Sequence, residues 1–595
     1  MPEYRHGIEV DFSRDQLFDP LGLIRLKESY MRDDEVSPQE RFAYVANAFG
    51  SNPEHAQRIY EYASKHWLSF ATPILSFGRS KRGLPISCYL SSVVDTAEGL
   101  VDAYAETSWL SMMGGGVGLG FNIRSADDKS TGVMAHLKTY DASTLAYKQG
   151  NTRRGSYAAY LDISHPDILT FLEIRKPTGD QNLRCLNLHH GVCLSDAFME
   201  IVERCTLDPN ADDSWELKDP HNGHVREVVS AKHLWEKIVE IRMHTGEPFI
   251  VFIDTVNNAR KQWQVDNNHL ISQSNLCTEI LQYTSADRTA VCCLSSLNAE
   301  YWDDWSKDER FIDDVMEFLD NVLQYFIDNA PDVVSKAKYA ASMERSVGVG
   351  VLGLHALFQK KEIPFESVEA KALNIKLFKH IDTLAEAASV RLASERGEAP
   401  DAVGHNQRFT YKTAPAPNAS SSLIVGNTSA SVEPTRANIY RQDTLSGPYI
   451  NKNKFLDNLI LELSVDKPDG WYDLAWSEVL NNDGSVQNVK WLSDEAKQVF
   501  KTAFEIDQNV IIDMAADRQH FIDQSQSINI FVRPTAHIKE VHSLHFDAWK
   551  KGVKTLYYLR SEKINTVEKV GKQVERERLD QVEVTTLEEC SNCEG

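Results

Sequence analysis

The feature that most constrains the fold is an alternation of short apolar runs and amphipathic stretches between about residue 81 and residue 295. Three of the runs predict strands: LPISCYLSSVVD, HHGVCLS and EPFIVFIDTV. Between the second and the third, DAFMEIVERC and AKHLWEKIVEIRMH have apolar residues at helical spacing. Because a helix between two strands returns the chain to the same end of the sheet, this alternation predicts an α/β architecture with many parallel strands.

Helices are expected on both sides of this region. In SPQERFAYVANAF, Ser37 is the expected N-cap, Pro38 opens the first turn and Glu40 completes a capping box. Two long helical blocks are expected at about 310–346 and 366–396, and residues 561–595 are charged and polar, as in a mobile tail. We therefore divide the chain into a helical domain (1–80), a large α/β domain (81–558) and a flexible tail (559–595).

The charge and the apolar pattern exclude several classes of protein. A formal net charge of −23 repels phosphate backbones and anionic lipids, so we expect neither a nucleic-acid partner nor a membrane partner. The first residues, MPEYRHGIEVDF, carry charges where a signal peptide has its apolar core, and no run approaches the ~20 apolar residues of a membrane helix. We expect a cytoplasmic protein whose nine cysteines are thiols.

Several of these cysteines stand in positions that suit redox chemistry. Cys590 and Cys593 form a CxxC pair in the tail, where a flexible arm could carry electrons between solvent and a buried site. A buried site would need a dithiol of its own. Cys88 lies on one expected strand and the adjacent Cys292 and Cys293 on another, so one cysteine from each strand could pair across a pocket. Taken singly, each of them is more often inert packing.

The stretch QSNLCTEILQY, residues 273–283, has Asn275, Cys277 and Glu279 at two-residue spacing. If the stretch is a strand, the three side chains share one face. A buried carboxylate beside a buried amide is costly unless it is paired or used. The pattern fits a hydrogen-bonded core cluster and a site in which Cys277 reacts and Glu279 moves protons equally well.

Three other motifs were weighed. The glycines of MMGGGVGLGFN follow a helical stretch and open no helix, so they indicate a tight turn with close backbone packing, and not a dinucleotide site. PNASSS, residues 417–422, offers hydroxyls and backbone N–H groups, which suits either a phosphate or an ordinary capped loop. The adjacent Tyr557 and Tyr558 are, taken alone, typical core or interface aromatics.

Taken together, these motifs resemble a known family. The order SC (87–88), SNLCTE (274–279), CCLSSLN (292–298), PNASSS, TLYY and the tail CxxC is similar to the large, catalytic subunit of class I ribonucleotide reductases. The resemblance runs from ATPILSFG to the C-terminal cysteines. It implies a ten-stranded α/β barrel with an inserted finger loop that carries the radical cysteine, preceded by a small helical domain and followed by a flexible redox tail.

The resemblance also implies roles for single residues in the reduction of ribonucleoside diphosphates to deoxyribonucleotides. Cys277 corresponds to the residue that becomes a thiyl radical and removes the 3′ hydrogen of the ribose. Glu279 corresponds to the base that takes the proton of the 3′-hydroxyl, and Asn275 to the residue that hydrogen-bonds to that hydroxyl. Cys88 and Cys292 correspond to the reducing dithiol, with Cys293 left as an alternative to Cys292. The remaining catalytic assignments are the radical relay Tyr557 and Tyr558 and the shuttle pair Cys590 and Cys593.

Binding residues follow in the same way. The residues that correspond to substrate contacts besides Asn275 and Glu279 are Thr72, Ser87, Ala419, Ser420 and Ser421. Relatives often have Glu at the position of Ala419, so backbone contact is expected there. The residues that correspond to contacts of a specificity effector (dTTP, dGTP, dATP or ATP) are Asp95, Arg124, Gln181 and Arg184, the last two in a loop at about 176–184 that links effector to substrate.

The implied partners are a radical-generating, metal-containing small subunit, thioredoxin or glutaredoxin, and a second copy of the chain, with effector-dependent assembly and no metal bound in this chain. Many relatives begin with a regulatory domain of ~90 residues. Only about 70 residues precede ATPILS here, so overall control by dATP through this subunit is not expected. The alternatives are the adenosylcobalamin-dependent class of the same enzyme, a thiol–disulfide oxidoreductase that uses only the tail CxxC, and a nucleotide-binding regulator without catalysis.

Overall fold

The computed structural model describes residues 7–80, 83–149, 153–444 and 447–561 of the 595. Cys590 and Cys593, expected to form the shuttle pair, lie outside the described residues. Within the described ranges, no helix is both long enough and apolar enough to cross a membrane.

The centre of the molecule is a curled sheet of nine strands, and the segment expected to carry the reactive cysteine lies against its inner side. Its main path runs β1-β11-β2-β3-β6-β7-β10-β16, with β12 paired to β11. The strands are β1 (Leu68–Phe70), β2 (Cys88–Ser92), β3 (Gly116–Gly120), β6 (Tyr157–Asp162), β7 (His189–Leu194), β10 (Phe249–Phe252), β11 (Ala290–Asn298), β12 (Val347–Leu352) and β16 (Thr555–Leu556).

Strand direction divides this sheet into two parts. The five strands β2, β3, β6, β7 and β10 are parallel neighbours, and β11 and β12 form a second parallel pair. The two parts meet at the antiparallel pair β2–β11, and β16 closes the far side as an antiparallel neighbour of β10. The α/β architecture with many parallel strands, expected from the alternation, and the barrel implied by the resemblance are therefore confirmed, although the sheet has nine strands in the described residues where the resemblance implies ten.

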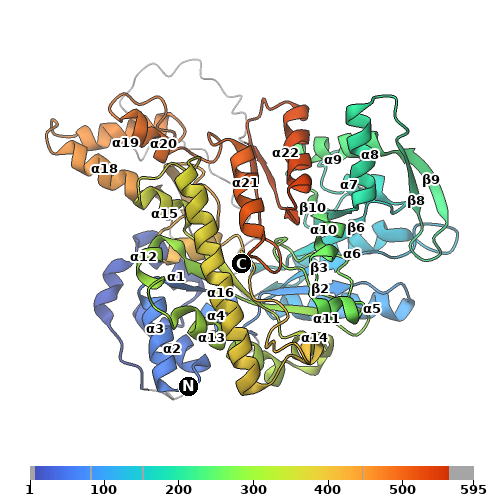
Figure 1. Ribbon diagram of the computed structural model, residues 1–595, viewed down its shortest axis with the longest axis horizontal. Coiled ribbons are helices and arrows are strands. Elements are labelled where there is room, and N and C mark those ends of the chain that lie inside the picture. The colour runs from blue at the N-terminus through green and yellow to red at the C-terminus, as the bar shows by residue number, and fades with distance from the viewer. Residues whose placement is uncertain (1–6, 81–82, 150–152, 445–446, 562–595) are drawn as a thin grey trace.

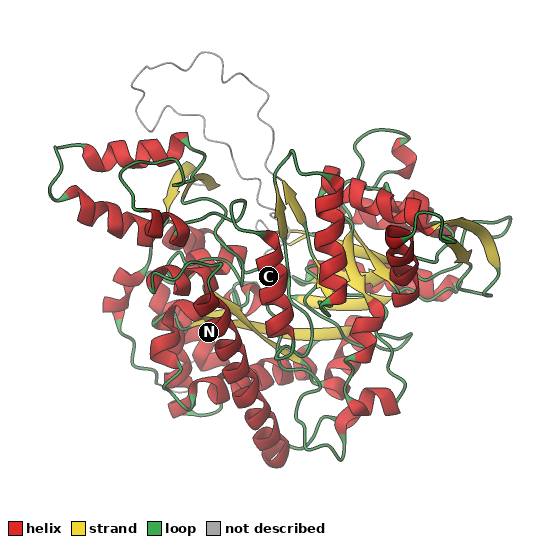
Figure 2. Ribbon diagram, turned by 45° about the horizontal axis from the view of Figure 1, so that its top comes forward, coloured by secondary structure: helices red, strands yellow, loops and turns green. Residues whose placement is uncertain are grey.

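Helices surround the sheet in both views (Figures 1 and 2). Those that follow the first part are α4 (Thr72–Leu75), α5 (Ala97–Met112), α6 (Gly132–Ala146), α7 (Ile168–Leu172), α8 (Asp196–Leu207), α9 (Ala231–Thr245), α10 (Ile253–Asn258) and α11 (Gln262–Asp266). Those of the second part are α12 (Trp302–Trp305), α13 (Phe311–Asn329), α14 (Ser335–Glu344), α15 (Leu354–Lys360), α16 (Val368–Arg396), α21 (Gln508–Gln519) and α22 (Ile538–Lys550). The expected helical blocks at 310–346 and 366–396 correspond to α13 with α14 and to α16.

Short elements complete the barrel domain. Its 3₁₀ turns are η2 (Gln181–Leu183), η3 (Ala299–Tyr301), η4 (Asp332–Val334) and η5 (Pro400–Ala402). Its two-stranded pairs are β4 (Lys148–Gln149) with β5 (Arg153–Arg154), β8 (Ser214–Lys218) with β9 (Val225–Ser230), and β15 (Ile530–Val532) with β17 (Leu559–Ser561).

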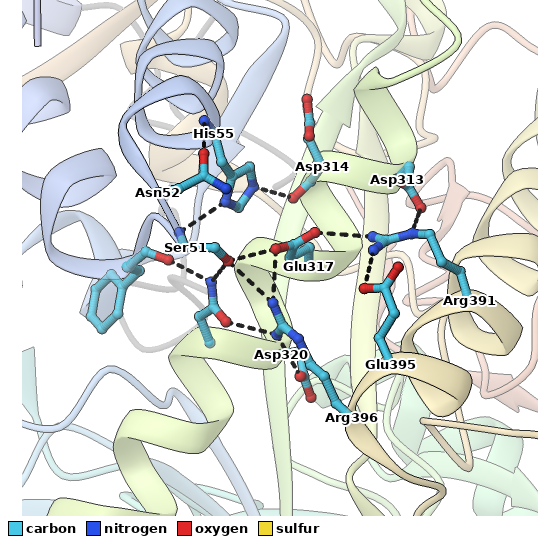
Figure 3. Close-up of polar contacts among 12 residues, drawn as sticks. Ser51, Asn52, His55, Asp313, Asp314, Glu317, Asp320, Arg391, Glu395 and Arg396 are labelled. Atoms are coloured by element: carbon cyan, nitrogen blue, oxygen red, sulfur yellow. Dashed lines mark hydrogen bonds and ion pairs between the residues drawn. The ribbon is translucent and has the colours of Figure 1, made fainter. Parts of the chain in front are cut away.

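The N-terminal segment is helical, as expected, and comprises η1 (Phe12–Leu17), α1 (Pro20–Ser29), α2 (Pro38–Phe49) and α3 (Pro53–Ser64). The expected capping box at Ser37 and Glu40 is present at the start of α2. A polar network ties the turn between α2 and α3 to α13 and α16 (Figure 3). In it, Ser51 donates to Glu317 at 2.5 Å and Arg396 contacts the same carboxylate at 2.7 Å. The helical segment is thus held on the outside of the barrel.

A smaller lobe follows the PNASSS motif. The motif itself begins the short helix α17 (Ala419–Ile424), which is buried. After it come β13 (Ile439–Thr444), β14 (Gly447–Lys452), α18 (Lys454–Ser464), α19 (Trp471–Asn481) and α20 (Asp494–Val499), which share a small core of their own around the fully buried Trp476. The three helices of this lobe project from one side of the barrel in Figure 1.

Candidate active site

The segment from residue 271 to residue 281 is a buried loop, and not the strand that two-residue spacing suggested. Residues 276–278 form a turn, and Thr278 has a left-handed backbone with φ of 70°. That conformation breaks the alternation of side chains, so the expectation that Asn275, Cys277 and Glu279 share the face of a strand is wrong. We call residues 271–281 the finger.

The finger lies directly against β3, whose alternate residues are glycines. A Cβ atom on Gly118 would stand 2.0 Å from the carbonyl oxygen of Ser274. On Gly116 and Gly120, it would come within 2.9 Å of the side chains of Leu276 and Gln273. The close backbone packing expected from the glycine run is confirmed, and it makes room for the finger inside the curled sheet.

Although the strand is absent, the polar side chains of the finger meet at one thiol. Asn275 Nδ2 lies 3.6 Å from Cys88 Sγ, and that sulfur lies 3.9 Å from Glu279 Oε1. Cys88 stands opposite Cys292 in the antiparallel register of β2 and β11, and Gln524 Nε2 contacts Cys292 Sγ at 3.6 Å. The geometry therefore gathers an amide, a carboxylate and two thiols in one buried place.

The register also separates the two adjacent cysteines. Cys292 is the residue directly opposite Cys88, whereas Cys293 pairs with Val347 of β12. Because neighbouring residues of a strand point to opposite faces, the side chain of Cys293 faces away from that of Cys292. Burial raises the pKa of the Cys293 thiol, and the nearby charge that adds to this effect is Asp320 on α13.

Glu279 is fully buried, and its electrostatics are unusual. Burial raises the pKa of this carboxyl to about 7, although hydrogen bonds from Asn275, Ser527 and Cys88 oppose the rise. The hydroxyl of Ser527 donates to Glu279 Oε2 at 3.3 Å and to the carbonyl of Cys277 at 2.6 Å. A carboxyl with this pKa exchanges a proton easily near neutral pH, as a general acid or base must.

The two tyrosines follow β16 and lie beside the finger. The hydroxyl of Tyr557 is 3.6 Å from Cys277 Sγ, and the rings of Tyr557 and Tyr558 are 4.3 Å apart between centroids. The hydroxyl of Tyr558 is 3.3 Å from Nδ1 of His189. A continuous series of aromatic and sulfur atoms therefore runs from Tyr558 to Cys277.

Several members of this site were not found from the sequence. The adjacent His189 and His190 both bind Glu247, at 2.7 Å and 3.1 Å. Burial alone would raise the pKa of Glu247, but His189 and Arg175 outweigh it and hold that pKa well below its usual range. Glu247 is far from both histidines along the chain, so no local pattern could join them.

A second group missed from the sequence supports the finger from its other side. The run QSQS at 524–527 is fully buried. Gln524 Oε1 accepts from the backbone N–H of Leu281 at 3.1 Å, and the backbone N–H of Ser525 donates to the carbonyl of Glu279 at 2.9 Å. In the sequence, four consecutive polar residues beside apolar runs are the signal that could have indicated this support, because polar groups that become buried must be hydrogen-bonded.

The expected substrate contacts lie on three segments, and Ser87 is the one that contacts a thiol of the site. Thr72 is the first residue of α4, and its hydroxyl is 3.3 Å from that of Tyr30. Ser87 lies next to Cys88, with 3.6 Å between Oγ and Sγ. Ala419, Ser420 and Ser421 form the first turn of α17.

A cavity opens between α17 and the small lobe. Its lining includes Pro417 and Ala419 at the start of α17, Lys452 and Lys454 from the lobe, and Tyr557. It therefore connects the PNASSS motif with the tyrosine that contacts Cys277. This is the arrangement a site needs if an anionic ligand is to reach the buried thiols.

The expected effector residues fall in two groups. Asp95 and Arg124 form an ion pair at 3.0 Å, which His221 approaches at 3.4 Å. Gln181 and Arg184 belong to one loop, and the backbone carbonyls of these two residues accept hydrogen bonds from the Lys138 ammonium, at 3.1 Å and 2.6 Å.

In the part of the chain that the structure describes, no cluster of three or more His, Cys, Asp or Glu side chains could hold a metal ion.

Comparisons with known proteins agree with this geometry. The family model "Ribonucleotide reductase, barrel domain" matches residues 86–406 and 400–559, and "Ribonucleotide reductase, all-alpha domain" matches residues 16–83. The ribonucleoside-diphosphate reductase large subunit of Invertebrate iridescent virus 3 is 48% identical over 99% of this chain and 100% of its own length. A putative large subunit from Frog virus 3 (isolate Goorha) is 44% identical over 92% of this chain and 94% of its own.

A solved structure gives the same result in three dimensions. The class Id ribonucleotide reductase alpha subunit of Actinobacillus ureae superposes with a TM-score of 0.79 at 32% identity, over 93% of this chain and 98% of that one. These matches span both the helical segment and the barrel. The chain therefore belongs to the ribonucleotide reductase large-subunit family.

Proposed function

We propose that the chain reduces ribonucleoside diphosphates to 2′-deoxyribonucleoside diphosphates by thiyl-radical chemistry. The observation that carries the proposal is the convergence, in one buried place, of the Cys88–Cys292 pair, Asn275 and Glu279, with Tyr557 in contact with Cys277. Relatives that match nearly the whole chain are named as ribonucleoside-diphosphate reductases, which supports diphosphates as substrates.

The groups of this site suffice for the chemistry. Cys277, as a thiyl radical, takes the 3′ hydrogen of the ribose, while Glu279 accepts the 3′-hydroxyl proton and Asn275 holds that oxygen. The 2′-hydroxyl then leaves as water with a proton from one thiol of the Cys88–Cys292 pair, and the 2′ carbon receives the hydrogen of the other thiol. The dithiol has then given up two electrons and become a disulfide. Glu279 returns its proton to the 3′ oxygen, and Cys277 returns the hydrogen atom to the 3′ carbon and becomes a thiyl radical again.

Burial serves this sequence of steps because a radical must be kept from solvent and from unwanted hydrogen donors. Cys277, Asn275 and Glu279 are all at most 4% exposed. The raised pKa of Glu279 supports its role as the base, because the carboxyl can both accept and return a proton near pH 7.

The radical must come from outside the chain, and the spent dithiol must be reduced again. Contact of Tyr557 with Cys277 and of Tyr558 with Tyr557 supports a relay of the radical from a metal-containing small subunit to the finger. We assign the re-reduction to Cys590 and Cys593, with thioredoxin or glutaredoxin as the source of electrons.

Regulation and assembly belong to the same proposal. A nucleotide effector (dTTP, dGTP, dATP or ATP) would bind near Asp95 and Arg124 and act on the substrate through the loop of Gln181 and Arg184. Exposed apolar side chains on the neighbouring helices α5 and α6, namely Val101, Trp109 and Leu145, support a homodimer with its interface there.

Replacement of Cys277 by Ser tests the proposal. In an assay of CDP reduction with a class I small subunit and a dithiol reductant, Cys277→Ser should form no deoxynucleotide, because an alcohol O–H bond is too strong to form the radical. Cys293→Ser is the matched control, since it removes a buried thiol that faces away from the site, and it should retain activity. Undiminished turnover by Cys277→Ser would contradict the proposal, as would turnover of the wild type with adenosylcobalamin and no small subunit.

A further inference from the structure

We propose that helix α1 forms one wall of the substrate's diphosphate site and that Arg25 on this helix binds the terminal phosphate. The inference deepens the proposed function, on which it rests, by giving the N-terminal helical segment a direct part in substrate binding. It starts from two contacts. The Arg25 guanidinium donates to Ser420 Oγ at 3.2 Å, and the Tyr30 hydroxyl lies 3.3 Å from Thr72 Oγ1.

These two contacts reach both segments that the substrate phosphates are expected to touch. Ser420 is in the first turn of α17, and Thr72 opens α4. Arg25 lies within α1, and Tyr30 is the residue that ends it. One helix therefore approaches both expected phosphate contacts, and an anion held between the two hydroxyls would lie next to the guanidinium.

The distance between α1 and α17 is as short as their backbones permit. A Cβ atom on Gly22 would stand 2.5 Å from the carbonyl oxygen of Leu423, so only glycine fits at this point. Gly22 precedes Arg25 by three residues and therefore shares its face of the helix. Close packing at Gly22 fixes the position of α1 and so holds Arg25 at the start of α17.

Charge explains why an arginine is useful there. The motif PNASSS carries no charged side chain, so its hydroxyls and N–H groups offer only neutral hydrogen bonds to a diphosphate. A terminal phosphate carries about −1.5 to −2 charges at pH 7. Lys454, the first residue of α18, forms an ion pair with Glu300 at 2.7 Å and a hydrogen bond to the Gly426 carbonyl at 2.8 Å. A guanidinium binds phosphate through paired hydrogen bonds, and Arg25 can supply that charge.

Equilibrium binding to the isolated full chain tests this assignment without any need for turnover. We would measure the Kd of CDP and of CMP for the wild type, for Arg25→Gln and for Lys27→Gln. Lys27 is exposed on the same helix, so its substitution removes one positive charge without touching α17. Arg25→Gln should weaken CDP roughly 10- to 100-fold, the usual range for a charge-assisted hydrogen bond. It should change CMP binding less than threefold, and Lys27→Gln should change neither.

Turnover assays add a readout that a merely structural role would not give. Arg25→Gln should raise KM for CDP and leave kcat within about threefold, while Arg25→Lys should recover part of the affinity. CDP binding by Arg25→Gln equal to that of Lys27→Gln would overturn the inference, as would an equal loss for CDP and CMP. If the wild type bound no CDP at all, the proposed function itself would fail, so the two failures are distinguishable.

Discussion

Substitution of Gly118 by alanine should inactivate the enzyme while leaving it folded. A built Cβ at this position lies 2.0 Å from the Ser274 carbonyl oxygen and 2.7 Å from Asn275 Cα, both of which are backbone atoms. The obstacle cannot rotate away as the end of a side chain can. Ordinary contact begins at 3.4 Å, so β3 and the finger must separate by about 1.4 Å, a shift of the kind that overpacking forces on a backbone.

The expected magnitudes follow from that displacement. Overpacking of this kind costs about 1–3 kcal/mol of unfolding free energy. The unfolding free energy of a domain is typically about 5–15 kcal/mol, so the variant should still fold. Activity is more sensitive, because a misplacement of about 1 Å at reacting groups can cost about 100-fold in rate. Asn275 and Cys277 both belong to the displaced segment, so a loss of about 100-fold or more is expected.

The assay compares Gly118→Ala with Gly116→Ala on the same strand. At Gly116 the added methyl group meets the flexible end of Leu276, which can adjust, so we expect a loss of less than tenfold. CDP reduction with the small subunit gives the rates, and thermal unfolding with circular dichroism checks the fold. Activity of Gly118→Ala within threefold of wild type, or equal losses in both variants, would refute the reasoning about the finger.

Four further outcomes are expected. Because burial raises the pKa of Glu279 to about 7 and the base must be ionised, the rate of CDP reduction should rise with pH through about 7. Glu279→Gln should reduce this rate at least about 100-fold and abolish its dependence on pH near 7. The fold favours the protonated carboxyl, so the wild type's unfolding free energy should decline as pH rises from 4.5 to about 7. In urea titrations this decline should be smaller in the Gln variant, in which Glu344, with a pKa raised to about 8, still contributes. Cys292→Ser should abolish deoxynucleotide formation while Cys293→Ser stays within about threefold of wild type, and the reverse result would exchange their assignments. Tyr557→Phe removes the hydroxyl that contacts Cys277, so turnover should stop while the Kd for CDP is unchanged, and retained turnover would exclude Tyr557 from the relay.

Local patterns predicted the elements of the fold well. The capping box at Ser37 and the helical blocks are present, because their signals lie within a few residues of one another. The prediction that failed is the strand expected at the finger. Thr278 adopts φ of 70°, a choice imposed by burial in the curled sheet, and two-residue spacing cannot distinguish such a turn from a strand.

The site itself depends on pairings that periodicity does not reveal. Cys292, and not Cys293, stands opposite Cys88 only because of the register between β2 and β11. Glu247 lies just before β10 and His189 is the first residue of β7, so their contact likewise exists only because the fold places these two strands side by side. Residues alone left Cys277 undecided between packing and chemistry. The resemblance to a family supplied its role, which remains a proposal.

The arrangement around the finger has a consequence for the order in which the protein is made. The finger that carries Cys277 packs against β3, which leaves the ribosome well before it, and against residues 525–527 and Tyr557, which leave it long after. Tyr557 lies within five residues of the end of the described chain. No nascent chain can therefore complete the pocket until synthesis is almost finished, because contacts this distant in sequence form only when both ends exist. Cys277 thus acquires its contact with Tyr557 and its enclosure together, in the final stage of synthesis.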